Sequence, residues 1–333
     1  MSVKIDKKKG GGEFTGTDHR SCPICRSDNV RLLFRNYDTM FGYPGWFHLD
    51  RCGECGHVFL RETFTPEMLT DLYSQYYLRS QFDLEKYEPY KETGGFLAWL
   101  DGDNAYCHRW VPPHSRVLDI GCGHCESLGY HQKRGCEVYG CEADDNTQKI
   151  AAKYGFNVFN GLFDDAPYEE NFFDYVTMNW VLEHCNDPEK TLRKVCTVLK
   201  PGGQLIFSIP NLPCISRYFF GRFWFQWQTP FHLHLFSETS ARMLLERCGF
   251  QRVQSQCLST SLFLIGQWGN LFTHGSYGKR ATITAARPNE KFGEKEKLWY
   301  VRFYRFLEKL RFHAWLERFA DRIGMGETRL YFA

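Results

Sequence analysis

The sequence feature that most constrains the fold is an apolar stretch that runs into an acid and two glycines. Residues 117–120 favour a strand that carries Asp119, and Gly121, Cys122 and Gly123 follow it. We expect a helix from about His124. Glycines let the backbone approach a ligand closely, and the N–H groups of the helix would point at that ligand. A dinucleotide-binding turn would place a third glycine at position 126, where this chain has Glu126.

A second acid follows the next predicted strand. The apolar stretch 136–141 ends at Glu142, about 20 residues after Gly121. This is the offset at which an acid binds ribose hydroxyls in nucleotide-binding α/β folds. Glu142 is therefore a candidate for the ribose of a nucleoside.

Two further segments continue the alternation of strands and helices. Residues 172–178 predict a strand, and Asn179 and Trp180 follow at its carboxyl end, where ligands bind in open α/β sheets. Asp187 before Pro188 predicts a helix start. Residues 199–203 end that helix and lead into a strand at 204–210.

Taken in this order, the segments resemble the motifs of class I S-adenosylmethionine-dependent methyltransferases. The resemblance implies an α/β, Rossmann-like fold with a mainly parallel sheet and an antiparallel last strand. It implies S-adenosylmethionine as the methyl donor. The residues expected to bind this donor are Asp119, Gly121, Cys122 and Gly123 at its amino-acid end, Glu142 at the ribose, Ala143, Gly161, Leu162 and Phe163 at the adenine, and Asn179 and Trp180 near the methionine moiety.

One position departs from the family pattern. Many members have a third small glycine where this chain has Cys125. A cysteine fits this position if its backbone φ is negative.

Two cysteine pairs near the N-terminus predict a metal site. Cys22 and Cys25 form one CxxC knuckle, and Cys52 and Cys55 form the second. Two thiolates on one tight turn can both reach a Zn²⁺ ion, and two such turns complete a closed tetrahedral shell. We expect a structural zinc ribbon. The sequence shows no secretory signal, so these cysteines are expected to stay reduced in the cytoplasm.

The patterns divide the chain into five regions. We expect a flexible tail at 1–18, the zinc ribbon at 19–60, a helical connector at 61–110, the donor-binding core at 111–260 and a C-terminal extension at 261–333. The extension would hold a helical insertion before a final strand. No run of residues is long and apolar enough for a transmembrane helix.

Three histidines are candidates for a catalytic base. If the acceptor is a hydroxyl group, a base with a pKa near neutrality assists the transfer, and histidine supplies it most readily. His184 follows the strand that ends near Asn179, and His232 and His234 lie on one face of an extended segment. Glu183 is expected to cap a turn or form a salt bridge. Cys122, Cys141 and Cys185 are expected to be packing residues.

Two aromatic segments stand outside these motifs. Residues 217–227 are expected to cover the substrate cleft or to pack in the core. Residues 298–323 predict a long helix rich in aromatic and cationic side chains. Such a helix packs against the core, contacts a second copy of the chain or lies on the inner surface of the membrane.

A zinc ribbon followed by this core resembles a bacterial group of methyltransferases that often act in surface-polysaccharide or specialised-sugar pathways. The resemblance implies a sugar, glycan or related small-molecule acceptor, methylated on oxygen. An RNA methyltransferase is a rival interpretation, but a net charge of +2 without a basic cluster at the knuckles gives no strong nucleic-acid signal. A lipid-linked acceptor and a non-catalytic donor-binding scaffold remain further alternatives.

Overall fold

The computed structural model describes residues 19–65, 68–69, 72–76, 87–260, 263, 267, 270–271, 275–279, 306, 309 and 311–333. The expected tail at 1–18 and most of the segment 280–310 lie outside these residues. The chain forms two compact units, each built from three stretches. The ribbon unit comprises residues 1–79, 211–240 and 261–327, and the core unit comprises residues 80–210, 241–260 and 328–333.

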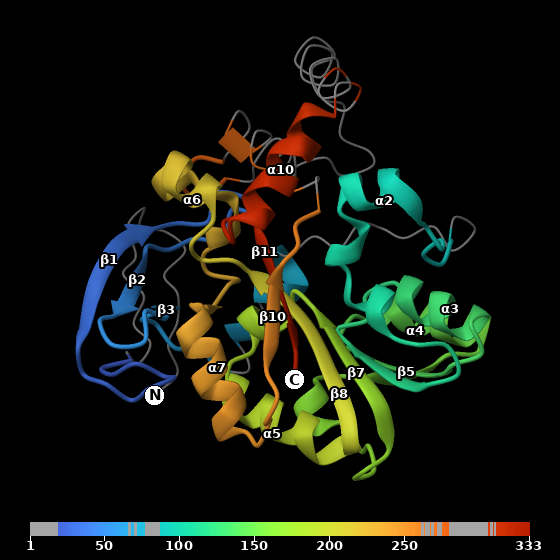
Figure 1. Cartoon of the computed structure of the whole chain (residues 1–333). Helices are drawn as coiled ribbons and strands as arrows, with labels where there is room; N and C mark the ends of the chain where they lie inside the picture. Colours follow the sequence, from blue (N-terminus) through green and yellow to red (C-terminus); the bar gives the residue numbers. More distant parts are fainter. Residues whose placement is uncertain are drawn as a thin grey trace. The chain divides into compact units, whose positions relative to one another are not determined.

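The core unit is organised around a sheet of seven strands in the order β10-β11-β8-β7-β4-β5-β6 (Figure 1). The four central pairings among β4, β5, β6, β7 and β8 are parallel, whereas β11 is antiparallel to both β8 and β10. The predicted fold class is therefore confirmed. The strands are β4 Arg116–Ile120, β5 Glu137–Glu142, β6 Asn157–Asn160, β7 Phe173–Asn179, β8 Leu199–Pro210, β10 Gln254–Cys257 and β11 Thr328–Phe332.

Helices connect the parallel strands, as crossovers of this kind require. Among them, α3 packs on β4 and β5, α4 on β6 and α5 on β8. The predicted start of α5 is confirmed, because the Asp187 side chain accepts a hydrogen bond from the Lys190 N–H at 3.0 Å. The helices and 3₁₀ turns of this unit are α2 Gly95–Asp101, η3 Asp103–Ala105, η4 Cys107–Trp110, α3 Glu126–Lys133, α4 Asp145–Tyr154, η5 Phe163–Asp165, η6 Leu182–His184 and α5 Pro188–Val198; α7 Glu238–Arg247 begins in the ribbon unit and ends in this one.

The middle of this sheet is apolar on both faces. Consecutive residues Leu205, Ile206 and Phe207 of β8 are all fully buried. Phe207 stacks on Tyr331 of β11, with ring centroids 4.8 Å apart. A strand buried on both faces needs no alternation of polar and apolar residues. This is why β8 reads as a continuous apolar run.

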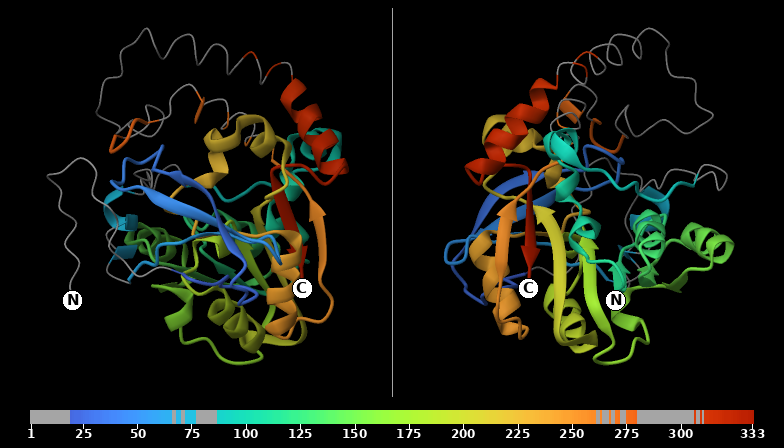
Figure 2. Two further views of the ribbon diagram at one scale, coloured as in Figure 1. Left: turned by 90° about the vertical axis from the view of Figure 1, so that its left-hand side faces the viewer. Right: turned by 45° about the vertical axis from the view of Figure 1, so that its right-hand side comes forward.

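The ribbon unit contains a smaller antiparallel sheet in the order β1-β2-β3-β9 (Figure 2). Its strands are β1 Val30–Asn36, β2 Phe47–Cys52, β3 Val58–Leu60 and β9 His234–Leu235. The remaining described elements are η1 Leu72–Tyr76, α6 Ile215–Phe220, η7 Gly221–Phe223, η8 Phe225–Trp227 and α10 Phe312–Arg322.

The two units do not follow the expected linear order of regions. The segment 211–240, expected in the donor-binding core, belongs to the ribbon unit. It supplies β9, which pairs with β3, and Trp224, Trp227 and Phe231 of the apolar cluster under the ribbon sheet. The expected connector at 61–110 is divided between the units, and its described helices are short.

The single long helix expected over residues 298–323 is wrong within the described residues. Phe306 and Lys309 are helical, but Arg311 has a φ of 49°, and α10 begins at Phe312. A left-handed residue turns the chain away from a right-handed helix. The segment is therefore interrupted at Arg311.

Candidate active site

The turn after β4 exposes backbone, as the glycine spacing predicts. Gly121 and Gly123 have φ angles of 69° and 54°. A Cβ atom on Gly121 would lie 2.6 Å from Val181 Cγ2, so only glycine fits there. At Gly123 the same atom would meet nothing within 4 Å. The turn thus packs on the protein at its first glycine and faces open space at the second.

Cys125 does not have the negative φ that would favour a cysteine at this position. Its φ is 63°, so the cysteine adopts the conformation that a glycine would favour. Its environment fixes this conformation: the Cys125 N–H donates to the Cys122 carbonyl at 2.9 Å, and the Cys125 carbonyl accepts from the Tyr87 hydroxyl at 2.9 Å. Helix α3 consequently begins at Glu126 rather than His124.

Asp119 lies at the carboxyl end of β4, buried beneath the turn. Its carboxylate accepts hydrogen bonds from the hydroxyls of Ser127 and Thr177, the latter at 2.7 Å. Burial is the main cause that raises its pKa to about 6, and the two hydroxyls oppose this shift. A carboxylate held in this way is suited to pair with a ligand ammonium group.

Glu142 holds the turn from the neighbouring strand. Its Oε2 accepts from the Gly123 N–H at 3.1 Å, and its Oε1 accepts from the N–H groups of Ala143 and Asp144 at 2.7 and 3.2 Å. The Gly123 carbonyl in turn accepts from the Thr147 hydroxyl at 2.6 Å.

Asp119 and the glycine turn border a cavity of about 170 Å³ at the carboxyl ends of β4 and β7. Asp119, Gly121, Cys122, Gly123, Asn179 and Trp180 line it, so the structure brings six of the predicted donor-binding residues together. The backbone N–H of Trp180 donates to the Ser208 carbonyl at 3.0 Å, and Asn179 Oδ1 accepts from the backbone N–H of Cys107 at 2.9 Å. The cavity is smaller than the 300–1,000 Å³ of most ligand sites, so it would enclose part of a donor molecule.

Sequence reasoning missed four residues that line this cavity: Tyr90, Tyr106, Glu126 and Ser127. Tyr106 packs edge-on against Trp180 with centroids 5.5 Å apart, and Tyr90 stacks on His108 at 4.5 Å. Glu126 and Ser127 open α3, so their position after the glycine turn could have identified them. Tyr90 and Tyr106 lie in no motif, and their sequence gives no such signal.

The residues predicted at the adenine do not line this cavity. Gly161 has a φ of 149°, and its N–H donates to the Glu142 carbonyl at 3.0 Å. Leu162 is exposed, whereas Phe163 is buried with the Lys194 ammonium 5.1 Å from its ring centre. The Ala143 N–H donates a hydrogen bond to Glu142 Oε1. Their contact with adenine stays a prediction.

Glu183 and His184 lie in the turn η6 that follows β7. A carboxylate oxygen of Glu183 and a ring nitrogen of His184 are within 4.8 Å of each other. Glu183 is fully buried, and neither of its oxygens has a hydrogen-bond partner among the described residues. The expectation that Glu183 caps a turn or forms a salt bridge is therefore wrong. Burial is the main cause that raises its pKa to about 8, and its own backbone N–H opposes this shift.

His232 and His234 lie in the ribbon unit, and both are buried. His232 Nδ1 donates to the Gln226 carbonyl at 2.7 Å, because a carbonyl can only accept. In the neutral ring, Nε2 is then the basic nitrogen. His234 Nδ1 shares a hydrogen bond of 3.1 Å with His57 Nε2, and burial lowers the pKa of His57 well below its usual value.

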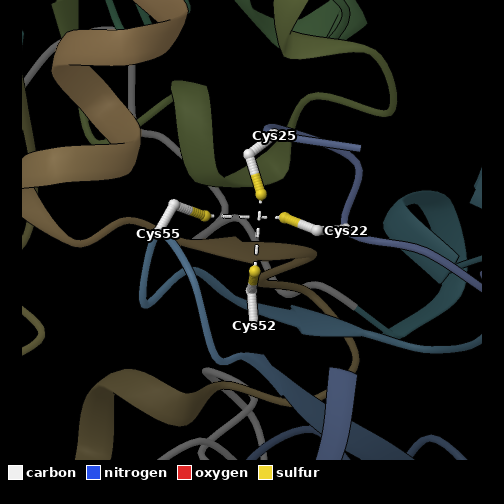
Figure 3. A group of neighbouring side chains, drawn as sticks. All are labelled: Cys22, Cys25, Cys52 and Cys55. Carbon is white, nitrogen blue, oxygen red and sulfur yellow. Dashed lines mark hydrogen bonds between the residues drawn. The ribbon is translucent and has the colours of Figure 1, made fainter. Parts of the chain in front are cut away.

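The four predicted metal ligands converge in the ribbon unit (Figure 3). The sulfur atoms of Cys22 and Cys55 are 3.6 Å apart, and those of Cys25 and Cys52 are 3.4 Å apart. A zinc tetrahedron with bonds of about 2.3 Å has edges of about 3.8 Å, so the four sulfurs fit such an ion.

Both knuckles have the same backbone form. The residue after each second cysteine is left-handed, with φ of 65° at Arg26 and 72° at Gly56. In the first knuckle the Arg26 N–H donates to the Cys22 carbonyl at 2.9 Å. Behind the second, the Ser237 hydroxyl donates to the Cys55 carbonyl.

The carboxylates, the glycine turn and the sheet edge define a class I α/β methyltransferase domain that binds its ligand at the carboxyl ends of the strands. A family model described as a methyltransferase domain matches residues 83–255, just over half of the chain. The chain belongs to this family, whose class I members use S-adenosylmethionine as the methyl donor.

Individual relatives match a shorter part of the chain. The sarcosine/dimethylglycine N-methyltransferase of Halorhodospira halochloris is 31% identical over 111 residues, which are 31% of this chain and 40% of that protein. The demethylmenaquinone methyltransferase of Listeria welshimeri is 32% identical over 116 residues, 31% of this chain and 49% of that protein. The chain thus spans less than half the length of these curated relatives.

Among solved structures, the phosphoethanolamine N-methyltransferase 2 of Haemonchus contortus, in complex with S-adenosyl-L-methionine, is 18% identical. It has a TM-score of 0.44 and covers 69% of this chain and 50% of that chain.

Proposed function

We propose that this protein transfers a methyl group from S-adenosylmethionine to a hydroxyl of a sugar, glycan or related small molecule. The observation that carries the donor is the position of Asp119 and the Gly121–Gly123 turn around one cavity, with Glu142 holding the turn from below. Asp119 would pair with the ammonium group of the donor. Backbone N–H groups of the turn would meet its carboxylate, and Glu142 would accept from the ribose hydroxyls.

The aromatic wall of the cavity supports the same donor. Tyr90, Tyr106 and Trp180 line the same cavity as Asp119. Aromatic faces attract cations, and a sulfonium is a cation until its methyl group leaves. Because the donor carries its own activation, the protein chiefly has to position the partners and exclude water.

In the proposed transfer, the acceptor oxygen forms a bond to the methyl carbon while the sulfur–carbon bond breaks, and the oxygen loses its proton. His184 is the favoured acceptor of that proton. His184 ends the turn η6, which closely follows the cavity residue Trp180, and it belongs to the same unit as the cavity. His232, with Nε2 as its basic nitrogen, is the second candidate.

The acceptor class rests on two features of the sequence. The ribbon followed by a class I core resembles enzymes that often act in sugar pathways, and the nearly balanced charge does not suit a nucleic-acid substrate. We further propose that Cys22, Cys25, Cys52 and Cys55 hold a structural zinc ion. Four thiolates close the shell, so no position remains for a substrate or a reactive water.

Titration calorimetry with S-adenosylmethionine and S-adenosylhomocysteine tests the donor. Folded protein that binds neither compound would refute the proposal. Transfer of a labelled methyl group to panels of nucleotide sugars, glycans and RNA then tests the acceptor. Label on RNA instead of on the hydroxyl compounds would favour the rival function.

Alanine variants test which of the two histidines is the base. His184→Ala should lower kcat by about 10²–10⁴-fold with donor affinity unchanged. His232→Ala serves as the matched variant. If only His232→Ala loses kcat, the base is His232.

A further inference from the structure

Helix α10 has its polarity reversed relative to an ordinary surface helix. Its buried residues include Glu317 and Arg318 as well as His313. Apart from Arg322, the exposed side chains of α10 and of the residue after it are apolar and between 44% and 61% exposed; they are Phe312, Trp315, Leu316, Phe319 and Ile323. This spacing places them along one face of the helix. A helix that turns charge inward and aromatic rings outward needs an apolar partner for its outer face.

The segment next to α10 in the ribbon unit has a similar surface. The Ile215 N–H at the start of α6 donates to the Met325 carbonyl at 2.9 Å, just after α10 ends. The Asn211 amide donates to the carbonyls of Gly324 and Gly326 at 3.1 and 2.7 Å. Along α6 and η7, Tyr218, Phe219 and Phe223 are exposed, and Phe219 is the most exposed of them at 75%. Figure 1 shows α6 and α10 near each other at the top of the view.

Exposed apolar residues are concentrated in these two segments. Among the described residues, ten of the nineteen exposed large apolar side chains lie at 215–223 or 306–323. We define the aromatic surface as Tyr218, Phe219, Phe223, Phe312, Trp315 and Phe319. Such a concentration exceeds the scattered exposed residues that soluble surfaces normally carry.

The charges around the aromatic surface are cationic. Arg217 and Arg222 lie among the rings of α6 and η7, and Arg322 is exposed near the end of α10. No Asp or Glu occurs from 211 to 237. The acids of the described part of α10 and its following turn, Glu317, Asp321 and Glu327, have buried side chains, and Asp321 pairs with Arg318 at 2.8 Å.

We propose that the aromatic surface docks on an anionic lipid bilayer. Aromatic rings at the headgroup level with arginines beside them are the composition of helices that lie in the membrane interface. Eleven residues of α10 extend about 16 Å, too short to span a bilayer. No helix among the described residues could cross one. In a two-fold contact between copies of this surface, arginines would face arginines, and the described residues of α6, η7 and α10 supply no exposed acid to match them.

The test is sedimentation of the full-length protein with vesicles. We expect binding to vesicles that contain phosphatidylglycerol, weaker binding to pure phosphatidylcholine and loss of binding as salt rises. The double variant Phe219→Ser with Phe319→Ser should lower the partition coefficient at least about tenfold, because it removes two rings from the interface. Leu97→Ser, which changes an exposed apolar side chain on α2, is the control and should not change it.

Three results would overturn this proposal. The full-length protein could fail to bind anionic vesicles, or the double variant could bind as well as the unchanged protein. Sedimentation velocity could instead show a dimer that the double variant dissociates, which would assign the surface to self-association. In calorimetry, S-adenosylmethionine should bind the double variant and the unchanged protein with equal affinity. A failure of the docking proposal is therefore distinguishable from a failure of the proposed enzymatic function.

Discussion

Glu142 Oε2 accepts a hydrogen bond of 3.1 Å from the backbone N–H of Gly123. This contact joins the end of β5 to the turn that follows β4, so one carboxylate sets the position of the loop that we assign to the donor. The same side chain accepts from Ala143 and Asp144 and therefore cannot easily rotate away. The proposed donor site would thus depend on Glu142 both for its shape and for its acceptor oxygens.

Replacement of Glu142 by alanine should weaken the binding of S-adenosylmethionine by two orders of magnitude or more. The variant loses the acceptor for the ribose and leaves three backbone N–H groups without their partner, and each such loss costs about 1–3 kcal/mol. Calorimetry measures the affinity, and the metal content of the ribbon should stay unchanged. Donor affinity equal to that of the unchanged protein would show that β5 does not contribute to the donor site.

The pKa of Asp119 predicts how donor binding depends on pH. Burial raises this pKa to about 6, so below pH 6 the side chain is increasingly neutral in the free protein. A donor ammonium pairs only with the carboxylate. Affinity should therefore fall as the pH drops below about 6, by up to about tenfold per unit, and level off above it. Asp119→Asn should bind weakly and without this slope in calorimetry between about pH 5 and pH 7. An unchanged slope in that variant would assign the titration to another group.

Loss of one cysteine ligand should unfold the ribbon sheet. Cys25→Ser leaves three thiolates, and the metal content, measured by mass spectrometry, should fall from one zinc ion per chain to near zero. Because β9 pairs with β3 in the same sheet, limited proteolysis should then cut both within 30–60 and within 211–240. Cys196→Ser, which changes a thiol of α5 outside the cluster, is the control. Full zinc content in Cys25→Ser would contradict the four-cysteine site.

Glu183 should make the protein less stable as the pH rises. Burial raises its pKa to about 8 in the folded state from 4.5, so the folded protein holds a proton that the unfolded chain releases. Stability is then greatest below about pH 4.5 for this group and is lost as the pH rises through about 8, on the order of a few kcal/mol in total. Glu183→Gln stays neutral and should lose less stability over this range. Urea unfolding of both proteins at several pH values measures the difference, since the other buried acids are common to the two. Parallel curves would show that Glu183 finds a partner in solution.

Local patterns predicted the parts of the molecule that local forces determine. The strand and glycine turn at 117–123 and the cap at Asp187 follow from apolar runs and turn residues, and the structure has them. The antiparallel direction of the final strand follows from the family resemblance, and the structure has it as well. The two cysteine knuckles converge because a CxxC spacing fixes each pair of sulfurs on one turn.

Tertiary contacts decide the features that the sequence did not reveal. Tyr90 and Tyr106 reach the cavity from a segment without regular periodicity. The left-handed Cys125 depends on the hydroxyl of Tyr87, far away in the chain. The pairing of β3 with β9 joins residues that a whole core unit separates in sequence, and no local rule predicts it. The sequence did not reveal that the aromatic face of α10 is exposed. Periodicity shows which residues share a face of a helix, but not whether that face is buried or exposed.

The place of β11 between β8 and β10 has a consequence for how the chain matures. Until residues 328–332 have been synthesised, β8 and β10 have no strand between them, and the backbone groups that pair with β11 stay without those partners. The largest sheet can therefore reach its full width only after the last of these residues has been added.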